Sequence, residues 1–597
     1  MIRSFTIALL LVLPVAVQAQ DAPKTVAITP SVLDALPDST TLVVRFRDCS
    51  DFVRKFKESP FYTLKDAPSM KEFLEAMKLK VSEGLKEARE DLGCAPMDLI
   101  TQIQGEVVLA VGGLAKVLKG IFEEMNGMPS TMTPGDIPIL FSVKAGSSSA
   151  KVEEYLQKIF VFIEKEGAKK EQMDFQGGTI WTFSESKPKD PSAPPAGDDL
   201  EKVYFAKKGT TFFFSINREF LQSTMAGVGG DPGSALTRNT DFVTTHRQVE
   251  TDSDLLVFVN IQSVTKALGK MLQNSMFGMF WTMIEAELIG KNLKNLGVSM
   301  SLRKDAIYSL SFFNTGGARE GLLALLDGPM FSSRKPVDGI PPDSEAFYAF
   351  TLNIPRLYSL VIKIADLAMT MFMGGGQGMS AEMMLEQQIG MKMRDVMEAF
   401  GSKVYYYNSL VKDSTDPMSF LNVTVGLELK SEEPVKNFLA KIPVITANFG
   451  LGGVPGAAPK TEKYLERDIY KFDDQSGFVV AFVDKTLVLG LQDSVKDLIR
   501  RKGKPGQSLV EKPEFQAVAK DMPAEVSAVG YAKPDSTMVT QYNDMLKMMF
   551  AGELPVPDLN QIYGLFGASG GYGVWTDKGF YSRSWGKFKE PAAKKGK

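Results

Sequence analysis

The sequence predicts an α+β protein built from two tandem copies of a unit, in which a mainly antiparallel sheet is flanked by helices. Three observations predict this fold class: short apolar runs bounded by turn residues, helical periodicity between some of those runs, and the return of the same landmarks later in the chain. Such hairpin-rich alternation favours antiparallel sheets with helices packed on one face. The chain has 597 residues, 44% hydrophobic and 23% charged, which is enough for several domains with buried cores.

A turn followed by a strand opens each predicted copy. Residues 36–39 read Leu-Pro-Asp-Ser and precede the apolar run 42–46, while residues 341–344 read Pro-Pro-Asp-Ser and precede the run 347–350. Aligning the Asp of the two turns gives an offset of 305 positions. A helix-like segment follows each run, so both stretches are predicted to form the same local structure.

Further along the chain, a fixed spacing separates matching residues of the two halves. A predicted hairpin at 203–214 has a counterpart at 478–489. Four matching pairs are each separated by 273 positions: Pro232 and Pro505, Leu236 and Leu509, Phe242 and Phe515, and Tyr308 and Tyr581. An ungapped frame over this length indicates an internal duplication. The Pro-rich stretch 187–199 predicts a solvated loop that is an insertion in the first copy.

The first residues predict export. Arg3 provides a positive charge before the apolar run 7–17, and Val17-Gln18-Ala19 carries acceptable residues at the positions that signal peptidase recognises. No later run reaches the roughly 18 apolar residues of a spanning helix. We therefore expect a mature chain without a transmembrane span, located in the periplasm or secreted. The predicted organisation is a signal peptide at 1–19, a first α+β copy at 25–331, a second α+β copy at 338–590 and a basic tail at 591–597.

These features together resemble a known family. The Pro-Asp-Ser turns before a strand, the export signal and the duplicated α+β layout are similar to those of large bacterial exported proteins in a domain-of-unknown-function family with an internal duplication. The resemblance covers most of the mature chain and rests on short motifs. The family has no established activity, so the resemblance implies no catalytic residues.

The residue content argues against several function classes. A net charge of -3 gives no overall attraction to nucleic acid. His246 is the single histidine and lies in a polar context, so we expect an exposed side chain, no metal site and no cofactor. Residues 567–571 read Gly-Ala-Ser-Gly-Gly, which matches a nucleophile elbow, but a strand-like segment and no histidine follow them. We therefore predict no catalytic residue, and a strand irregularity at these glycines.

The two cysteines, Cys49 and Cys94, leave two interpretations open. In an oxidising compartment an even pair is typical of a disulfide, which here would lie within the first copy. Alternatively, the two thiols are separate and buried, where they act as small hydrophobic side chains.

Methionine is unusually frequent, with 30 residues. Several of them follow helical spacing and predict a wide apolar helix face. The first copy contributes Met271, Met276, Met279 and Met283, and the second contributes Met545 and Met549. Three interpretations compete: packing of the core, an adaptable apolar groove for a lipid, peptide or partner, and a thioether copper(I) site.

The leading functional hypothesis is a non-catalytic exported binding or scaffold protein of unknown ligand, with an apolar groove lined by these methionines. Its partner would be an apolar ligand or an envelope protein. Two alternatives stand beside it. One is an envelope hydrolase with a site between the two copies, and the other is a structural subunit of an envelope complex.

Overall fold

The computed structural model divides the chain into two compact units. Unit 1 comprises Met1–Thr282, Asn292–Gly317 and Leu546–Ile562, and unit 2 comprises Met283–Lys291, Ala318–Met545 and Tyr563–Lys597. The structure describes residues 31–84, 103–125, 132–184, 202–229, 235–250, 253–273, 278–372, 380–408, 423–448, 459–471, 477–533 and 558–589. The predicted signal peptide, Pro-rich loop and basic tail lie outside these residues.

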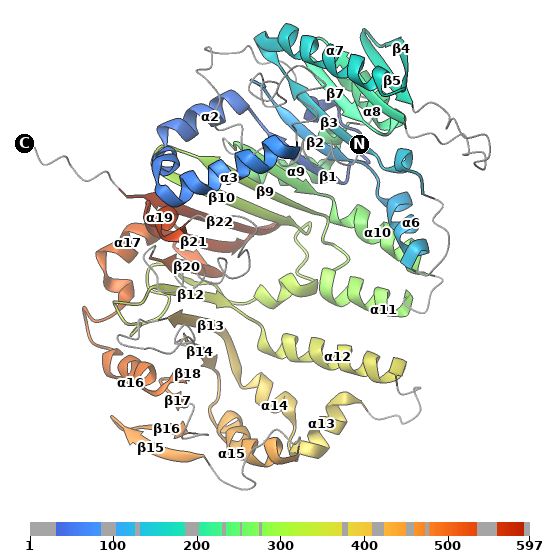
Figure 1. The fold of residues 1–597 in the computed structure, drawn as a ribbon. Coiled ribbons are helices and arrows are strands. Elements are labelled where there is room, and N and C mark those ends of the chain that lie inside the picture. The colour runs from blue at the N-terminus through green and yellow to red at the C-terminus, as the bar shows by residue number, and fades with distance from the viewer. Residues whose placement is uncertain are drawn as a thin grey trace, which may run out of the picture. The chain divides into compact units, whose positions relative to one another are not determined.

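Unit 1 contains an antiparallel sheet of ten strands among its described residues (Figure 1). Hydrogen-bonded neighbours give the order β4-β5-β6-β7-β3-β2-β1-β8-β9-β10. The strands are β1 Leu42–Phe46, β2 Val107–Val111, β3 Ile139–Lys144, β4 Lys169–Phe175, β5 Gly178–Ser184, β6 Lys202–Lys208, β7 Thr211–Ser215, β8 Leu255–Val259, β9 Asn295–Leu302 and β10 Ala306–Asn314.

Unit 2 also contains an antiparallel sheet of ten strands within the part of the chain that is described. Its order is β15-β16-β17-β18-β14-β13-β12-β20-β21-β22. The strands are β12 Ala346–Thr351, β13 Phe400–Asn408, β14 Val423–Leu429, β15 Lys460–Tyr464, β16 Arg467–Lys471, β17 Phe478–Phe482, β18 Thr486–Leu491, β20 Ala528–Ala532, β21 Phe566–Trp575 and β22 Gly579–Phe588. A separate short pair joins β11 (Phe331–Ser332) to β19 (Glu525–Val526).

Helices cover these sheets, which confirms the predicted α+β class. Those of unit 1 are α2 Cys49–Glu58, α3 Pro68–Gly84, α6 Ala115–Met125, α7 Ser149–Lys165, α8 Arg218–Gly227, α9 Thr240–Val249 and α10 Ile261–Leu272, with 3-10 turns at Val32–Ala35, Pro60–Asp66, Pro134–Asp136, Gly146–Ser148 and Leu236–Arg238. Those of unit 2 are α12 Ile354–Phe372, α13 Ala381–Ile389, α14 Met393–Glu398, α15 Glu433–Asn448, α16 Gln492–Arg501 and α17 Pro513–Ala519, with 3-10 turns η8 Gly321–Leu326 and Leu509–Glu511. The chain passes from one unit to the other at five points, and two of these lie in described helices, α11 Gly278–Met283 and α19 Leu559–Tyr563.

The two sheets have the same strand order, and their pairing keeps the spacing that the sequence predicts. Val257 of β8 pairs with Val298 of β9. In unit 2, Gly530 of β20 pairs with Gly571 of β21. Gly530 is 273 positions after Val257, and Gly571 is 273 positions after Val298. The strand pairs β8–β9 and β20–β21 therefore match residue for residue.

The turn before the first strand corrects the predicted alignment by one residue. The N–H of Leu236 donates to the carbonyl of Leu36 at 2.7 Å, and the N–H of Leu509 donates to the carbonyl of Ile340 at 2.8 Å. Leu36 therefore corresponds to Ile340, an offset of 304, and the predicted offset of 305 is wrong. The one-residue difference matters, because a shift of one residue in a strand turns every side chain to the opposite face of the sheet. The backbone hydrogen bonds therefore decide which residues of the two strands correspond.

The cores of the two units are built on aromatic side chains. In unit 1, Phe160 is fully buried, and its ring centroid lies 5.2 Å from Trp181 and 5.0 Å from Phe183. In unit 2, Phe515 is fully buried beside Tyr531, with 5.5 Å between the ring centroids. Edge and tilted contacts of this kind stabilise a core beyond the area that they bury.

Candidate functional site

Helix α12 of unit 2 begins directly after strand β12. The side chain of Asn353 caps it, since its Oδ1 accepts a hydrogen bond from the backbone N–H of Arg356 at 3.0 Å. Pro355 lies in the first turn, where a missing N–H costs little. The helix has 19 residues and is apolar on most of its circumference. Among the described residues, no helix is both long enough and apolar enough to cross a membrane.

One side of α12 packs into the core of unit 2. Ile354 and Tyr358 contact a buried cluster that includes Met393 and Val396 of α14. Burial raises the pKa of the Tyr358 hydroxyl to about 12, and the nearby carboxylate of Glu382 adds to this shift. This side therefore packs the helix against unit 2, and the two remaining sides of the helix do not take part in this packing.

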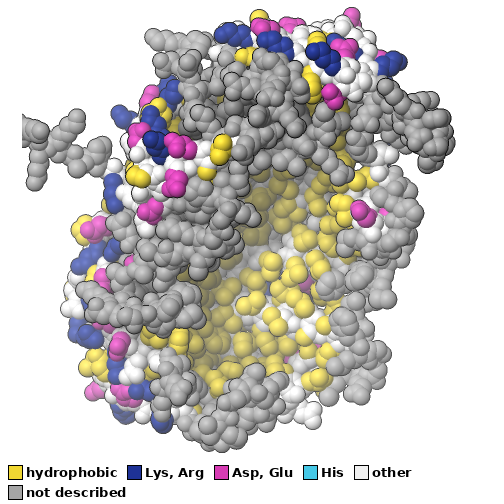
Figure 2. Space-filling view, in the orientation of Figure 1, with side chains coloured by type: hydrophobic (Ala, Val, Ile, Leu, Met, Phe, Trp, Pro, Cys, Tyr) yellow, Lys and Arg dark blue, Asp and Glu magenta, His cyan; other side chains and the backbone are white. Residues whose placement is uncertain are grey.

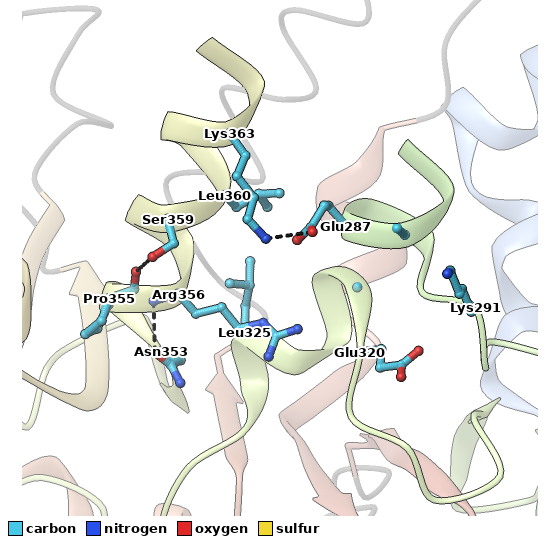
Figure 3. Close-up of a pocket in the computed structure, with 12 residues that line it drawn as sticks. Glu287, Lys291, Glu320, Leu325, Asn353, Pro355, Arg356, Ser359, Leu360 and Lys363 are labelled. Carbon is cyan, nitrogen blue, oxygen red and sulfur yellow. Dashed lines mark hydrogen bonds and ion pairs between the residues drawn. The ribbon is translucent and has the colours of Figure 1, made fainter. Parts of the chain in front are cut away.

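A second side of α12 lines a cavity of about 630 Å³ (Figure 3). The other walls are η8 and the segment that ends in Lys291. At the base, Leu325 and Leu360 are buried. Figure 3 shows Arg356 extending from α12 past Leu325, with Glu320 and Lys291 on the opposite side of the same space. All the lining residues belong to unit 2.

Two glycines bring the cavity walls together. A Cβ on Gly321 would lie 2.5 Å from the carbonyl oxygen of Ile289, and one on Gly290 would lie 3.1 Å from Glu320. Both glycines have positive φ, which side chains disfavour. The segment before Gly290 is a π-helix, Ile284–Ile289, a form often found at functional sites. This close packing positions Glu287 and Lys291 at the cavity.

The cavity carries more positive than negative charge. Lys363 and Glu287 form an ion pair of 2.6 Å, so their charges compensate each other. Within the described chain, Arg356, Lys291 and Glu320 have no ion-pair partner, although all three line the cavity. Two unpaired cations against one unpaired carboxylate leave an excess of one positive charge.

The third side of α12 is an apolar stripe, which we define as Leu357, Val361, Ile364 and Ala368. These positions recur every three or four residues and so share one side of the helix. The side chain of Val361 is 53% exposed, Ala368 is exposed, and the other two are partly exposed. Figure 2 shows mainly hydrophobic side chains over α12 and the neighbouring strands of unit 2.

The sheet of unit 2 also exposes aromatic side chains. Tyr348 of β12 and Tyr406 of β13 are directly paired and stack at 4.9 Å between ring centroids. Each is 36% exposed. Burial raises the pKa of both hydroxyls.

The predicted methionine groove falls largely outside the described residues. Met276, Met545 and Met549 lie outside them, and for Met279 only the backbone, in α11, is described. Met271 lies on α10 of unit 1 and Met283 ends α11, and both are partly exposed. The methionine groove therefore stays a prediction. Sequence reasoning missed the stripe of α12, whose signal was the apolar content of residues 354–369.

The cysteines do not form a described bond. Cys49 has a free thiol and is partly exposed, and Cys94 lies outside the described residues. Burial and, secondarily, the charge of Asp48 raise the pKa of the Cys49 thiol to about 12. Cys49 is therefore a poor nucleophile in this state, because the thiolate is the reactive form. The disulfide stays a prediction.

The environment of His246 corrects the expectation of an exposed side chain. His246 lies on α9, is only 22% exposed, and its ring stacks on Phe242 at 5.2 Å. Its Nε2 contacts the carboxylate of Glu250. Burial alone would raise the pKa of Glu250, but the hydrogen bond with His246 and the charge of Arg45 outweigh it and lower the pKa to about 2.

Arg45 connects this pair to the interior of unit 1. Its guanidinium donates to Glu250 at 2.6 Å and to Glu106 at 2.7 Å. Glu106 is 5% exposed and also accepts the backbone N–H of Val32 at 2.8 Å. We call Arg45, Glu106, Glu250 and His246 the unit 1 ion network. Arg45, Glu106 and Glu250 hydrogen-bond to one another, which is typical of a structural role.

The Gly-Ala-Ser-Gly-Gly motif at residues 567–571 lies inside a strand. Ser569 lies within strand β21, with a register shift between Phe566 and Ser569, so the expected strand irregularity is confirmed. A nucleophile elbow would need a helix after the Ser. In the described part of the chain, no group of three or more His, Cys, Asp or Glu side chains is placed to bind a metal ion.

The chain was compared with known proteins at three levels. Neither the protein-family models, nor the curated proteins, nor the solved structures contain a match to it. Among the described residues, the best-defined candidate site is the surface of α12 with its adjoining cavity.

Proposed function

We propose that this chain is an exported, non-catalytic binding protein, and that unit 2 binds an apolar molecule along the stripe of α12. The observation that supports this most is the exposure of Val361, at 53%, within a stripe without any charged side chain. A contiguous apolar surface of this kind is typical of an interaction site. The export signal supports a location in the periplasm or outside the cell.

The dimensions of the stripe favour a single hydrocarbon chain as its occupant. Leu357 and Ala368 are eleven positions apart, which corresponds to about 16 Å along a helix. A stable protein partner needs roughly 800 Å² on each side, far more than four side chains provide. A linear acyl chain, by contrast, can lie along one side of one helix. We therefore infer an acyl chain rather than a protein partner.

The apolar contacts alone would give weak binding. Complete burial of a Val, Leu or Ile side chain contributes roughly 1.5–3 kcal/mol, and those of the stripe are already partly covered. Covering the rest would contribute on the order of 4 kcal/mol, which corresponds to a Kd near 1 mM. Tighter binding requires polar contacts as well.

An uncharged fluorescent probe, N-phenyl-1-naphthylamine, tests this proposal on the purified mature chain. We expect the probe to bind, and Val361→Glu to raise its Kd at least fivefold, because the new charge would have to be buried with the probe. Val161→Glu is the matched control, since Val161 is 51% exposed on α7 of unit 1. Equal probe affinity in the two variants would contradict the proposal.

We also propose that the two units arose by duplication of one ancestral unit. The shared strand order and the constant spacing of 273 positions through β8–β10 and β20–β22 support this origin. Gly297 and Gly570, also 273 positions apart, each face side chains of the helix packed on that part of the sheet, α9 and α17 respectively.

A further inference from the structure

The cavity and the apolar stripe adjoin each other on α12. A helix turns by about 100° per residue, so positions four apart differ by roughly 40° around the axis. Leu360 lines the cavity, and Ile364 of the stripe is four positions later. A molecule lying along the stripe would therefore pass Leu360 and reach the charged residues of the cavity.

We propose that the cavity binds the anionic head group of the amphiphile whose acyl chain lies on the stripe. This inference rests on the proposed function and names the class of ligand, an acyl chain with one anionic head such as a carboxylate. Arg356 and Lys291 provide the positive charge, and neither has an ion-pair partner in the described part of the chain. The planar guanidinium of Arg356 can donate two parallel hydrogen bonds to a carboxylate.

The cavity is larger than one head group needs, and it has room for the hydration shell of the head and for part of the acyl chain. Ligand pockets for small molecules usually measure about 300–1,000 Å³, and this cavity measures about 630 Å³. Lys363 does not compete for the ligand, because Glu287 already pairs with it at 2.6 Å. The positive charge available to an anion is therefore that of Arg356 and Lys291, which lie on different sides of the cavity in Figure 3.

Glu320 provides an opposing charge in the same cavity. In Figure 3 it lies between Arg356 and Lys291, with its carboxylate pointing away from Arg356, and as a lining residue it would repel an anion in the cavity. The net excess of one positive charge favours a head with a single negative charge over one with two. Removing the Glu320 charge should therefore strengthen binding, whereas removing either cation should weaken it.

The experiment compares two competitors with the same chain, dodecanoate and 1-dodecanol, each displacing N-phenyl-1-naphthylamine from the purified mature protein. We expect dodecanoate to displace the probe at a concentration about tenfold lower than dodecanol does. Arg356→Gln or Lys291→Gln should bring this ratio to threefold or less, and Glu320→Gln should increase it about threefold. Lys392→Gln, which removes an exposed lysine of unit 2 outside the cavity, should leave the ratio unchanged.

The outcomes separate this inference from the proposed function. If the probe binds through Val361 but the two competitors act at equal concentration, the head-group site is wrong and the apolar stripe stands. If the probe fails to distinguish Val361→Glu from Val161→Glu, the proposed function itself is wrong. Inorganic phosphate should not bind measurably at 1 mM by calorimetry. Phosphate binding as tight as that of dodecanoate would identify a site for free anions and would contradict the proposal that the cavity binds the head of an amphiphile.

Discussion

Units 1 and 2 share one strand order but differ in the helix that follows their first strand. In unit 1, α2 has ten residues and a charged surface, where Arg54 forms ion pairs with Asp51 and Glu58. In unit 2, α12 has 19 residues and carries the apolar stripe. The difference teaches that two sheets with the same strand order can be covered by helices of different length and different surface character.

A second difference lies inside the sheets. Arg45 of β1 pairs with Leu256, and Ala349 of β12 pairs with Val529, which is 273 positions later. The two residues therefore occupy equivalent places, but unit 1 has a guanidinium and unit 2 has a buried methyl group. Unit 1 consequently depends on charge pairing where unit 2 depends on apolar packing alone.

The largest expected effect concerns what the units share. Phe242 is 1% exposed and Phe515 fully buried, 273 positions apart, so Phe242→Ala and Phe515→Ala should each lower the free energy of unfolding by about 3–5 kcal/mol. Urea denaturation measures the loss, and hydrogen exchange locates it in β8 and β9 or in β20 and β21. The two residues would not be equivalent if the two losses of stability differed severalfold, or if hydrogen exchange placed both losses in the same unit.

Breaking the unit 1 ion network should have the next largest effect. Glu106→Leu leaves the Arg45 guanidinium, 11% exposed, without the more deeply buried of its two carboxylate partners and should cost about 3 kcal/mol. Adding Arg45→Met should recover at least half of the loss, because a buried pair can be replaced by apolar side chains. Urea denaturation of the two single variants and the double variant gives their free energies of unfolding, which together form a double-mutant cycle. No recovery in the double variant would show that the charges do not act as a pair.

The pH dependence of unit 1 should follow Glu250. Its pKa is about 2 in the folded state, below the ordinary 4.5, so its stabilisation is present above pH 4.5 and is lost as the pH falls through 2. Glu250→Gln should therefore cost about 2 kcal/mol at pH 7 and less than about 0.5 kcal/mol at pH 2. Unfolding curves at pH 7, 4 and 2 measure this dependence. A cost that persists at pH 2 would assign the effect to packing instead.

The smallest expected effect concerns the stripe. Val361→Glu changes an exposed position and should alter the free energy of unfolding by no more than about 0.5 kcal/mol. Thermal unfolding of this variant beside Val161→Glu checks the value. A loss above about 1.5 kcal/mol would mean that the stripe packs against the protein itself and is not a surface for a ligand.

The sequence predicted the strands better than the site. The hairpin at 203–214 and its counterpart at 478–489 are confirmed as β6–β7 and β17–β18, because turn residues and apolar runs are local signals. The alignment at the first strand was wrong by one residue, since similar side chains occupy different positions of the two turns. Backbone hydrogen bonds decide that register, and a comparison of side chains does not reveal them.

The cavity and the stripe could not be predicted, because both depend on tertiary contacts. Gly290 and Gly321 are 31 positions apart in the sequence and approach each other only in the fold, and their packing places Lys291 opposite Arg356. In the same way, the apolar residues of α12 do not reveal which side the core covers. Leu360 is 7% exposed and Val361 is 53% exposed, although they are neighbours in the sequence.

Photo-crosslinking tests most directly whether unit 2 holds the ligand. The purified mature chain would be irradiated with a fatty acid that carries a diazirine in its chain, and the labelled peptides would be mapped by mass spectrometry. We predict that the label lies within residues 354–372 and is lost in Val361→Glu. Label concentrated in α10 of unit 1, or spread equally over both units, would contradict the assignment of binding to α12.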